Sequence, residues 1–99
     1  MTSRLRILRD YFPTAIFTGK ALVFISEEWR VELTERSRGG VAPGQGSPVI
    51  RVRIFARDQN GEFQPGHYED FEIEEISDLA GEIEKFVQFA VGKNLREMS

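Results

Sequence analysis

The sequence contains no cysteine and a single histidine, His67, among its 99 residues. The absence of cysteine excludes disulfide bonds, thiol catalysis, iron–sulfur clusters and cysteine-ligated zinc. Because one chain cannot supply two histidine ligands, we expect no metal and no cofactor. No apolar run approaches the roughly 20 residues that span a bilayer, and the N-terminus lacks the apolar segment of a secretory signal. We therefore expect a cytoplasmic protein with no membrane partner, nucleoid-associated in a bacterium or phage and nuclear in a eukaryote.

The patterns of common catalytic sites are also missing. A serine nucleophile would need His67 as its base, and no Gly-x-Ser-x-Gly turn frames a serine. The glycines of residues 39–46 lack the lysine and the following helix of a phosphate-binding loop. The alternating carboxylates Asp70, Glu72 and Glu74 are typical of a solvated strand face. We expect a protein that is not an enzyme.

The length of the chain predicts one domain, residues 1–99, with a modest core. Leu5, Leu8 and Phe12 share a helical face before Pro13, so residues 1–13 are either a short helix or a disordered basic arm. Four glycines and two prolines in residues 39–48 predict a flexible loop within the domain.

Residues 21–26 are predicted to form a strand, with a short pairing segment before them, because residues 15–26 are rich in β-branched and aromatic side chains. Alternating apolar and polar side chains predict three further strands, residues 29–36, 49–57 and 70–76. Turn signals at Asn60-Gly61 and Pro65-Gly66 separate the last two strands. The order predicts an α+β fold, a curved four-stranded antiparallel sheet followed by one C-terminal helix.

That helix is predicted over residues 78–91, with Ser77 as its N-cap and Gly92 as its end. Gly81 inside it indicates close packing, because glycine weakens a helix. The apolar stripe is wide for one small sheet to cover, so we expect a homodimer. The expected dimer interface consists of Ile83, Phe86, Val87, Phe89 and Ala90.

The net charge of −3 hides an uneven distribution. Residues 1–57 carry ten Lys and Arg against five Asp and Glu, and residues 58–99 carry three against eleven. The basic half can attract a polyanion, or the two halves can neutralise each other across the fold. The acidic pI of about 5.2 counts against nucleic-acid binding.

The sharpest functional pattern is a predicted strand face that combines arginines with an aromatic ring. Guanidinium groups neutralise phosphates, and an exposed phenylalanine stacks on a base. Neighbouring cations and a tryptophan at a strand end extend this face. The candidate nucleic-acid-binding residues are Lys20, Trp29, Arg30, Arg36, Arg51, Arg53, Phe55 and Arg57.

Strand register decides whether these arginines are free, and two registers remain open. A tight turn at Asn60-Gly61 places Arg57 opposite Glu62 and Arg53 opposite Gly66. If residues 58–67 are all loop, Arg53 instead faces Glu72, Arg51 faces Glu74 and Phe55 faces Asp70. Opposed residues share a sheet face, so the second register partly neutralises the arginines.

Several segments resemble the PC4-like family of transcriptional coactivators, small proteins that bind single-stranded DNA as homodimers. The family pattern is a strand of the form Ile-x-Ile-Arg-x-Tyr, an Asp, a Gly-Glu-x-x-Pro-Gly loop, a short strand and a dimerising helix. The matching segments are Trp29–Leu33, Ile50–Phe55, Asp58, Gly61–Gly66 and Ser77–Val91. After Pro-Gly the family usually has basic residues and a glycine, whereas this chain has His67-Tyr68-Glu69-Asp70. By residue match, the resemblance implies a binding role for Arg53 and Phe55.

Two functions follow as expectations. In the first, the protein is a non-catalytic single-stranded nucleic-acid-binding protein, with DNA favoured over RNA as its partner, that serves as a transcription or replication accessory factor. In the second, it is a dimeric regulatory module whose acidic residues 69–84 contact a basic protein partner.

Overall fold

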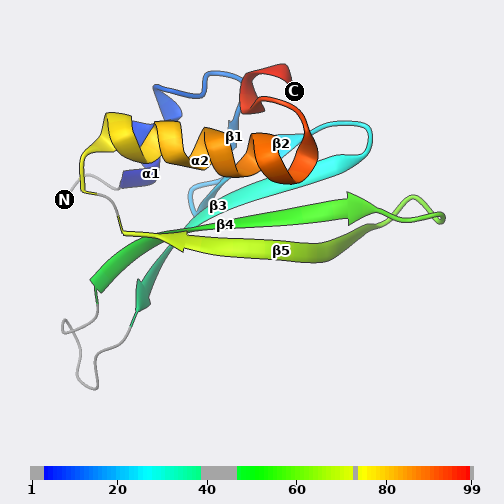
Figure 1. The fold of residues 1–99 in the computed structure, drawn as a ribbon, viewed down its shortest axis with the longest axis horizontal. Helices are drawn as coiled ribbons and strands as arrows, with labels where there is room; N and C mark the ends of the chain where they lie inside the picture. The colour runs from blue at the N-terminus through cyan, green and yellow to red at the C-terminus, as the bar shows by residue number, and fades with distance from the viewer. Residues whose placement is uncertain (1–3, 39–46, 73, 99) are drawn as a thin grey trace.

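The computed structural model of the protein describes residues 4–38, 47–72 and 74–98 (Figure 1). Its elements in chain order are α1 (Arg4–Arg9), β1 (Ile16–Phe17), β2 (Ala21–Ile25), β3 (Trp29–Arg38), β4 (Ser47–Arg57), β5 (Phe63–Phe71), α2 (Ile76–Val91) and the 3₁₀ helix η1 (Leu95–Glu97). The strands form one antiparallel sheet in the order β1-β2-β3-β4-β5. The predicted α+β class, antiparallel sheet and C-terminal helix are confirmed, but the sheet has five strands instead of four.

The helices lie on one side of the sheet, and in Figure 1 α2 runs above β4 and β5 in nearly the same direction as these strands. The core fills the space between them with apolar side chains from α1, β2, β3, β4, α2 and η1. Leu5 and Leu8 are buried in it, so residues 4–9 form the short helix that was one of two alternatives for the N-terminal segment. The amide of Leu5 donates to Oε1 of Glu35 at 3.1 Å and ties α1 to β3.

The last strand differs most from its prediction. β5 begins at Phe63, seven residues earlier than expected, and ends at Phe71. The Asn60-Gly61 signal makes the turn, with Gly61 at φ 82°, and Asp58 accepts hydrogen bonds from the amides of Asn60 at 2.8 Å and Glu62 at 3.0 Å. The second signal, Pro65-Gly66, is not a turn but lies within the strand, beside a register shift.

Two smaller predictions are also corrected. β4 begins at Ser47, so the predicted loop at 39–48 overlaps the strand by two residues, and its remainder lies outside the described residues. Helix α2 begins at Ile76 with Glu75 as its N-cap, because the Glu75 side chain accepts from the Ser77 amide at 3.3 Å. The predicted helix end is confirmed, since Gly92 has the left-handed φ of 80°.

The predicted dimer interface is only partly accessible. Ile83 and Val87 are fully buried in the core of their own chain, which removes them from any surface. Phe86 and Ala90 are half-buried, and Phe86 packs edge-on against Phe71 with ring centroids 5.9 Å apart. Phe89 projects from α2 with 91% of its surface exposed.

Candidate nucleic-acid interface

Side chains alternate between the two faces of the sheet, and we call the face turned away from the helices the open face. Three rows of directly opposed residues cross β3, β4 and β5 on this face: Arg30–Phe55–Pro65, Glu32–Arg53–Tyr68 and Thr34–Arg51–Asp70. Arg57 lies opposite Phe63 at one end of the rows. The predicted shared face of Arg51, Arg53, Phe55 and Arg57 agrees with this register.

Neither of the two registers considered from the sequence is correct. Pairing starts beside the turn with Arg57 opposite Phe63, close to the tight-turn alternative. A shift between Arg53 and Phe55 then adds one residue on β5, so Tyr68 and not Gly66 lies opposite Arg53. Glu72 and Glu74 lie beyond the end of β5, and the residues opposite Arg51 and Arg53 are Asp70 and Tyr68 instead.

Arg51 is held by a carboxylate. Its Nε donates to Oδ1 of Asp70 at 2.8 Å, and one terminal nitrogen donates to Oδ2 at 3.1 Å. The hydrogen bonding to Asp70 raises the pKa of Arg51, against the opposing effect of burial. The guanidinium carbon also lies 4.5 Å from the centroid of the Tyr68 ring. Arg51 was expected to contact phosphates, but its charge is already neutralised by Asp70.

Two other candidate residues, Arg30 and Trp29, are not available on the open face: the first has a carboxylate partner, and the second points to the helical side of the sheet. Arg30 Nε donates to Oε2 of Glu32 at 3.0 Å, so this arginine also has a carboxylate partner. Trp29 points to the opposite face of the sheet, because it shares the face of Val31, and it packs half-buried against the core. Trp29 therefore does not belong to the open face on which stacking was expected.

The remaining cations are accessible. Arg36, Arg53 and Arg57 are exposed, and within the described ranges none of the three forms an ion pair with a carboxylate. The Arg57 guanidinium carbon lies 4.7 Å from the Phe63 ring centroid. Lys20 is exposed in the turn between β1 and β2, at the margin of the sheet. These side chains can neutralise phosphates without first breaking an ion pair within the described residues.

Sequence reasoning missed the aromatic and ring-bearing residues that β5 adds to the open face. Phe63 and Pro65 share it with Phe55, and Tyr68 joins them with 57% of its surface exposed. On the open face, the β5 residues are odd-numbered up to Pro65 and even-numbered from Tyr68 onward. One extra residue in a strand produces such a change of phase. That phase shift was the signal available in the sequence.

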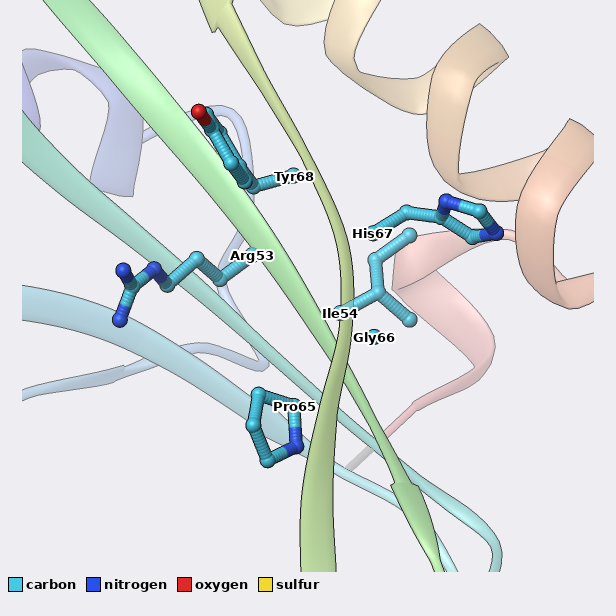
Figure 2. A pocket seen from close by; sticks show the side chains of 6 residues that line it. All are labelled: Arg53, Ile54, Pro65, Gly66, His67 and Tyr68. Atoms are coloured by element: carbon cyan, nitrogen blue, oxygen red, sulfur yellow. The ribbon is translucent and has the colours of Figure 1, made fainter.

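A hollow of about 180 Å³ lies at this shift. It is lined by Arg53, Ile54, Pro65, Gly66, His67 and Tyr68. Figure 2 shows Arg53, Pro65 and Tyr68 on one side of the strands, whereas His67 points toward helix α2. Three of the residues that line the hollow, Arg53, Pro65 and Tyr68, therefore belong to the open face.

A search of protein-family models, of curated proteins and of solved structures finds no match to this chain. In the described part of the chain, no helix is long and apolar enough to cross a membrane. The same residues contain no group of three or more His, Asp and Glu side chains placed to hold a metal ion. The argument for function accordingly depends on the open face itself.

Proposed function

We propose that the protein is a non-catalytic, single-stranded nucleic-acid-binding protein that acts as an accessory factor in transcription or replication. The observation that carries this proposal is that one sheet face combines rings with exposed arginines that form no ion pair within the described residues. Arg53 and Arg57 provide charge for phosphates, and the exposed Tyr68 and the half-buried Phe55 provide surfaces for bases. This is the PC4-like activity expected from the sequence.

The face favours single strands over a duplex. Bases in a duplex are stacked on each other and expose only their edges, whereas an unpaired strand can lay its bases on aromatic side chains. A tyrosine that is more than half exposed beside an arginine fits the second case. Little sequence preference is expected, because every base has a π-face.

The test is a titration of the full chain with a labelled single-stranded oligonucleotide at about 50 mM and 200 mM salt. Binding should weaken steeply with salt, because phosphate contacts release counterions. The double variant Arg53→Ala/Arg57→Ala should bind more weakly and reduce the salt slope by about two. The control is Arg6→Ala, which removes an exposed arginine from α1 on the helical side. Absence of binding by the wild-type chain at about 50 mM salt would end the proposal.

We also propose that the protein is a homodimer through the accessible part of α2. A hollow of about 440 Å³ lies beside Phe89, lined by Phe86, Ala90, the β5 residues His67 and Glu69, and Tyr68. A two-fold contact brings the same patch of both copies together. The projecting Phe89 ring of each copy then fills the hollow of the other.

A second candidate function is a regulatory module that contacts a basic protein. Exposed carboxylates follow one another from the end of β5 into α2: Glu69, Glu72, Glu74, Glu75, Asp78 and Glu82. Such a one-sign surface attracts and orients a basic partner. If this function is correct, partner capture should be lost in Glu72→Lys/Glu74→Lys while oligonucleotide binding is kept; capture that is insensitive to both changes counts against it.

A further inference from the structure

The Tyr68 ring is supported on one side. Arg51 lies over it at 4.5 Å, and the bidentate contact with Asp70 fixes that guanidinium in place. On β4, Arg53 lies opposite Tyr68, and Arg51, two residues earlier, lies opposite Asp70. The supporting guanidinium therefore lies on the side of the Tyr68 ring nearer to Asp70. The ring also lines the hollow of about 180 Å³, together with Pro65 and Arg53.

The register shift sets the spacing between Tyr68 and Pro65. On β4, Arg53 lies opposite Tyr68 and Phe55 lies opposite Pro65, and these two β4 residues are two positions apart. Two strand residues span about 7 Å. Carbon atoms in contact are about 3.5–4.0 Å apart. The offset along the strands therefore leaves room for one planar ring beside Tyr68, between the rows of Tyr68 and Pro65.

We propose that this hollow is a slot for one nucleobase, which stacks on Tyr68 and is bordered by Pro65. This inference depends on the proposed function and adds to it a defined subsite for a single base. Arg53 lines the slot without an ion-pair partner in the described chain, so it binds the phosphate next to the inserted base. Arg51 is a positioning residue, because Asp70 neutralises its charge and it acts through the Tyr68 ring.

The first experiment measures affinity for a six-nucleotide single strand by fluorescence anisotropy. Loss of one stacked base is expected to weaken binding roughly 5- to 100-fold in Tyr68→Ala. The salt slope should stay the same, because no phosphate contact is removed. Tyr68→Phe keeps the ring and should bind like the wild type. The matched control is Tyr11→Ala, which removes another partly exposed tyrosine outside the sheet.

The second experiment removes the support and keeps the ring. Asp70→Asn leaves the Arg51 guanidinium without its carboxylate, so binding should weaken by less than in Tyr68→Ala. In the double variant Asp70→Asn/Tyr68→Ala, the Asp70 change should add nothing, because its effect passes through the ring. Circular dichroism of each variant checks that the sheet is intact.

A third measurement detects the base directly. In amide NMR spectra, a nucleoside monophosphate at millimolar concentration should shift the signals of Gly66, His67 and Tyr68. Ribose 5-phosphate, which has the same phosphate and no base, should leave these signals in place. Equal shifts with both compounds would indicate a phosphate site and overturn the slot.

The outcomes separate the slot from the function on which it depends. If the wild-type chain binds no oligonucleotide, both proposals fail. If it binds and Tyr68→Ala behaves like Tyr11→Ala, the slot is wrong and single-strand binding stands. If Tyr68→Ala lowers the salt slope as Arg53→Ala does, the ring acts through charge, and stacking is overturned.

Discussion

Gly66 lies so close to Ile54 that a β-carbon on residue 66 would be 3.1 Å from the Ile54 carbonyl oxygen. The contact lies at the register shift, where β5 carries one more residue than β4. A backbone oxygen cannot rotate away as a side chain can, so the two strands would have to separate. The close approach therefore belongs to the same feature that places Tyr68 opposite Arg53.

Gly66→Ala should consequently destabilise the protein by about 1–3 kcal/mol, the usual cost of overpacking. Chemical denaturation of both proteins gives the difference in the free energy of unfolding. Gly66→Ala also restricts the unfolded chain, which alone would stabilise the fold by about 0.4–1 kcal/mol. A stabilised variant would show that the strands accept the methyl group and that the approach is not tight.

Gly81→Ala should have the opposite effect. Gly81 is exposed inside α2, and a β-carbon there would meet nothing within 4 Å. The close packing predicted from the sequence is therefore wrong. Alanine is favoured over glycine inside a helix by about 0.5–1 kcal/mol, so the free energy of unfolding should rise by that amount. A decrease in the same denaturation assay would mean that the site is crowded.

The sequence was sufficient to predict β2, β3, β4 and α2 to within a few residues. The periodicity of β3, β4 and α2 is uninterrupted, and β2 is a short apolar run rich in β-branched and aromatic residues. The sequence was not sufficient for β5. Phe63 and Pro65 follow one alternation and Tyr68 and Asp70 another, and no single period fits both. Two turn signals were also present, and Asp58 favours the first through hydrogen bonds that depend on the folded turn.

The same limit applies to the candidate site. Alternation alone was enough to place Arg51, Arg53 and Phe55 on one face. The partners of each arginine depend on cross-strand register, and a shift of one residue changes all of them. Asp70 is opposite Arg51 only because of the extra residue on β5, and neither register considered from the sequence contained that pair.

The turn between β4 and β5 should show a pH dependence that comes from Asp58. Hydrogen bonds lower the pKa of this carboxyl: the Glu62 amide contributes most, then the Gln64 side chain, and then the Asn60 amide, while burial opposes them. Because the folded pKa lies below the unfolded value of about 3.9, the stabilisation is fully present above that value. It is lost as the pH falls through the folded pKa.

The melting temperature of Asp58→Asn should therefore depend less on pH than that of the wild type between about pH 5 and 2. The wild type should be the more stable protein at pH 5, and the difference should shrink on acidification. The asparagine oxygen still accepts a hydrogen bond, so the variant keeps the shape of the turn. Parallel melting curves across this range would show that Asp58 does not contribute through its charge.

Phe89 should control the oligomeric state. Its ring is 91% exposed beside the hollow lined by Phe86 and Ala90, and an aromatic side chain buries about 150–250 Å² when it is covered. In a two-fold dimer both copies bury this ring, so Phe89→Ser removes two such contacts at once. The variant should retain the fold of the wild type, because little of the ring contacts its own chain.

Sedimentation at tens of micromolar should give the wild type twice the chain mass of 11.3 kDa and the Phe89→Ser variant the single mass. The matched control is Ile16→Ser, which removes a 54% exposed apolar side chain from β1, at the opposite edge of the sheet from β5, and should leave the dimer intact. A wild type that sediments as a single chain would refute the dimer. A dimer that persists in Phe89→Ser would place its interface elsewhere.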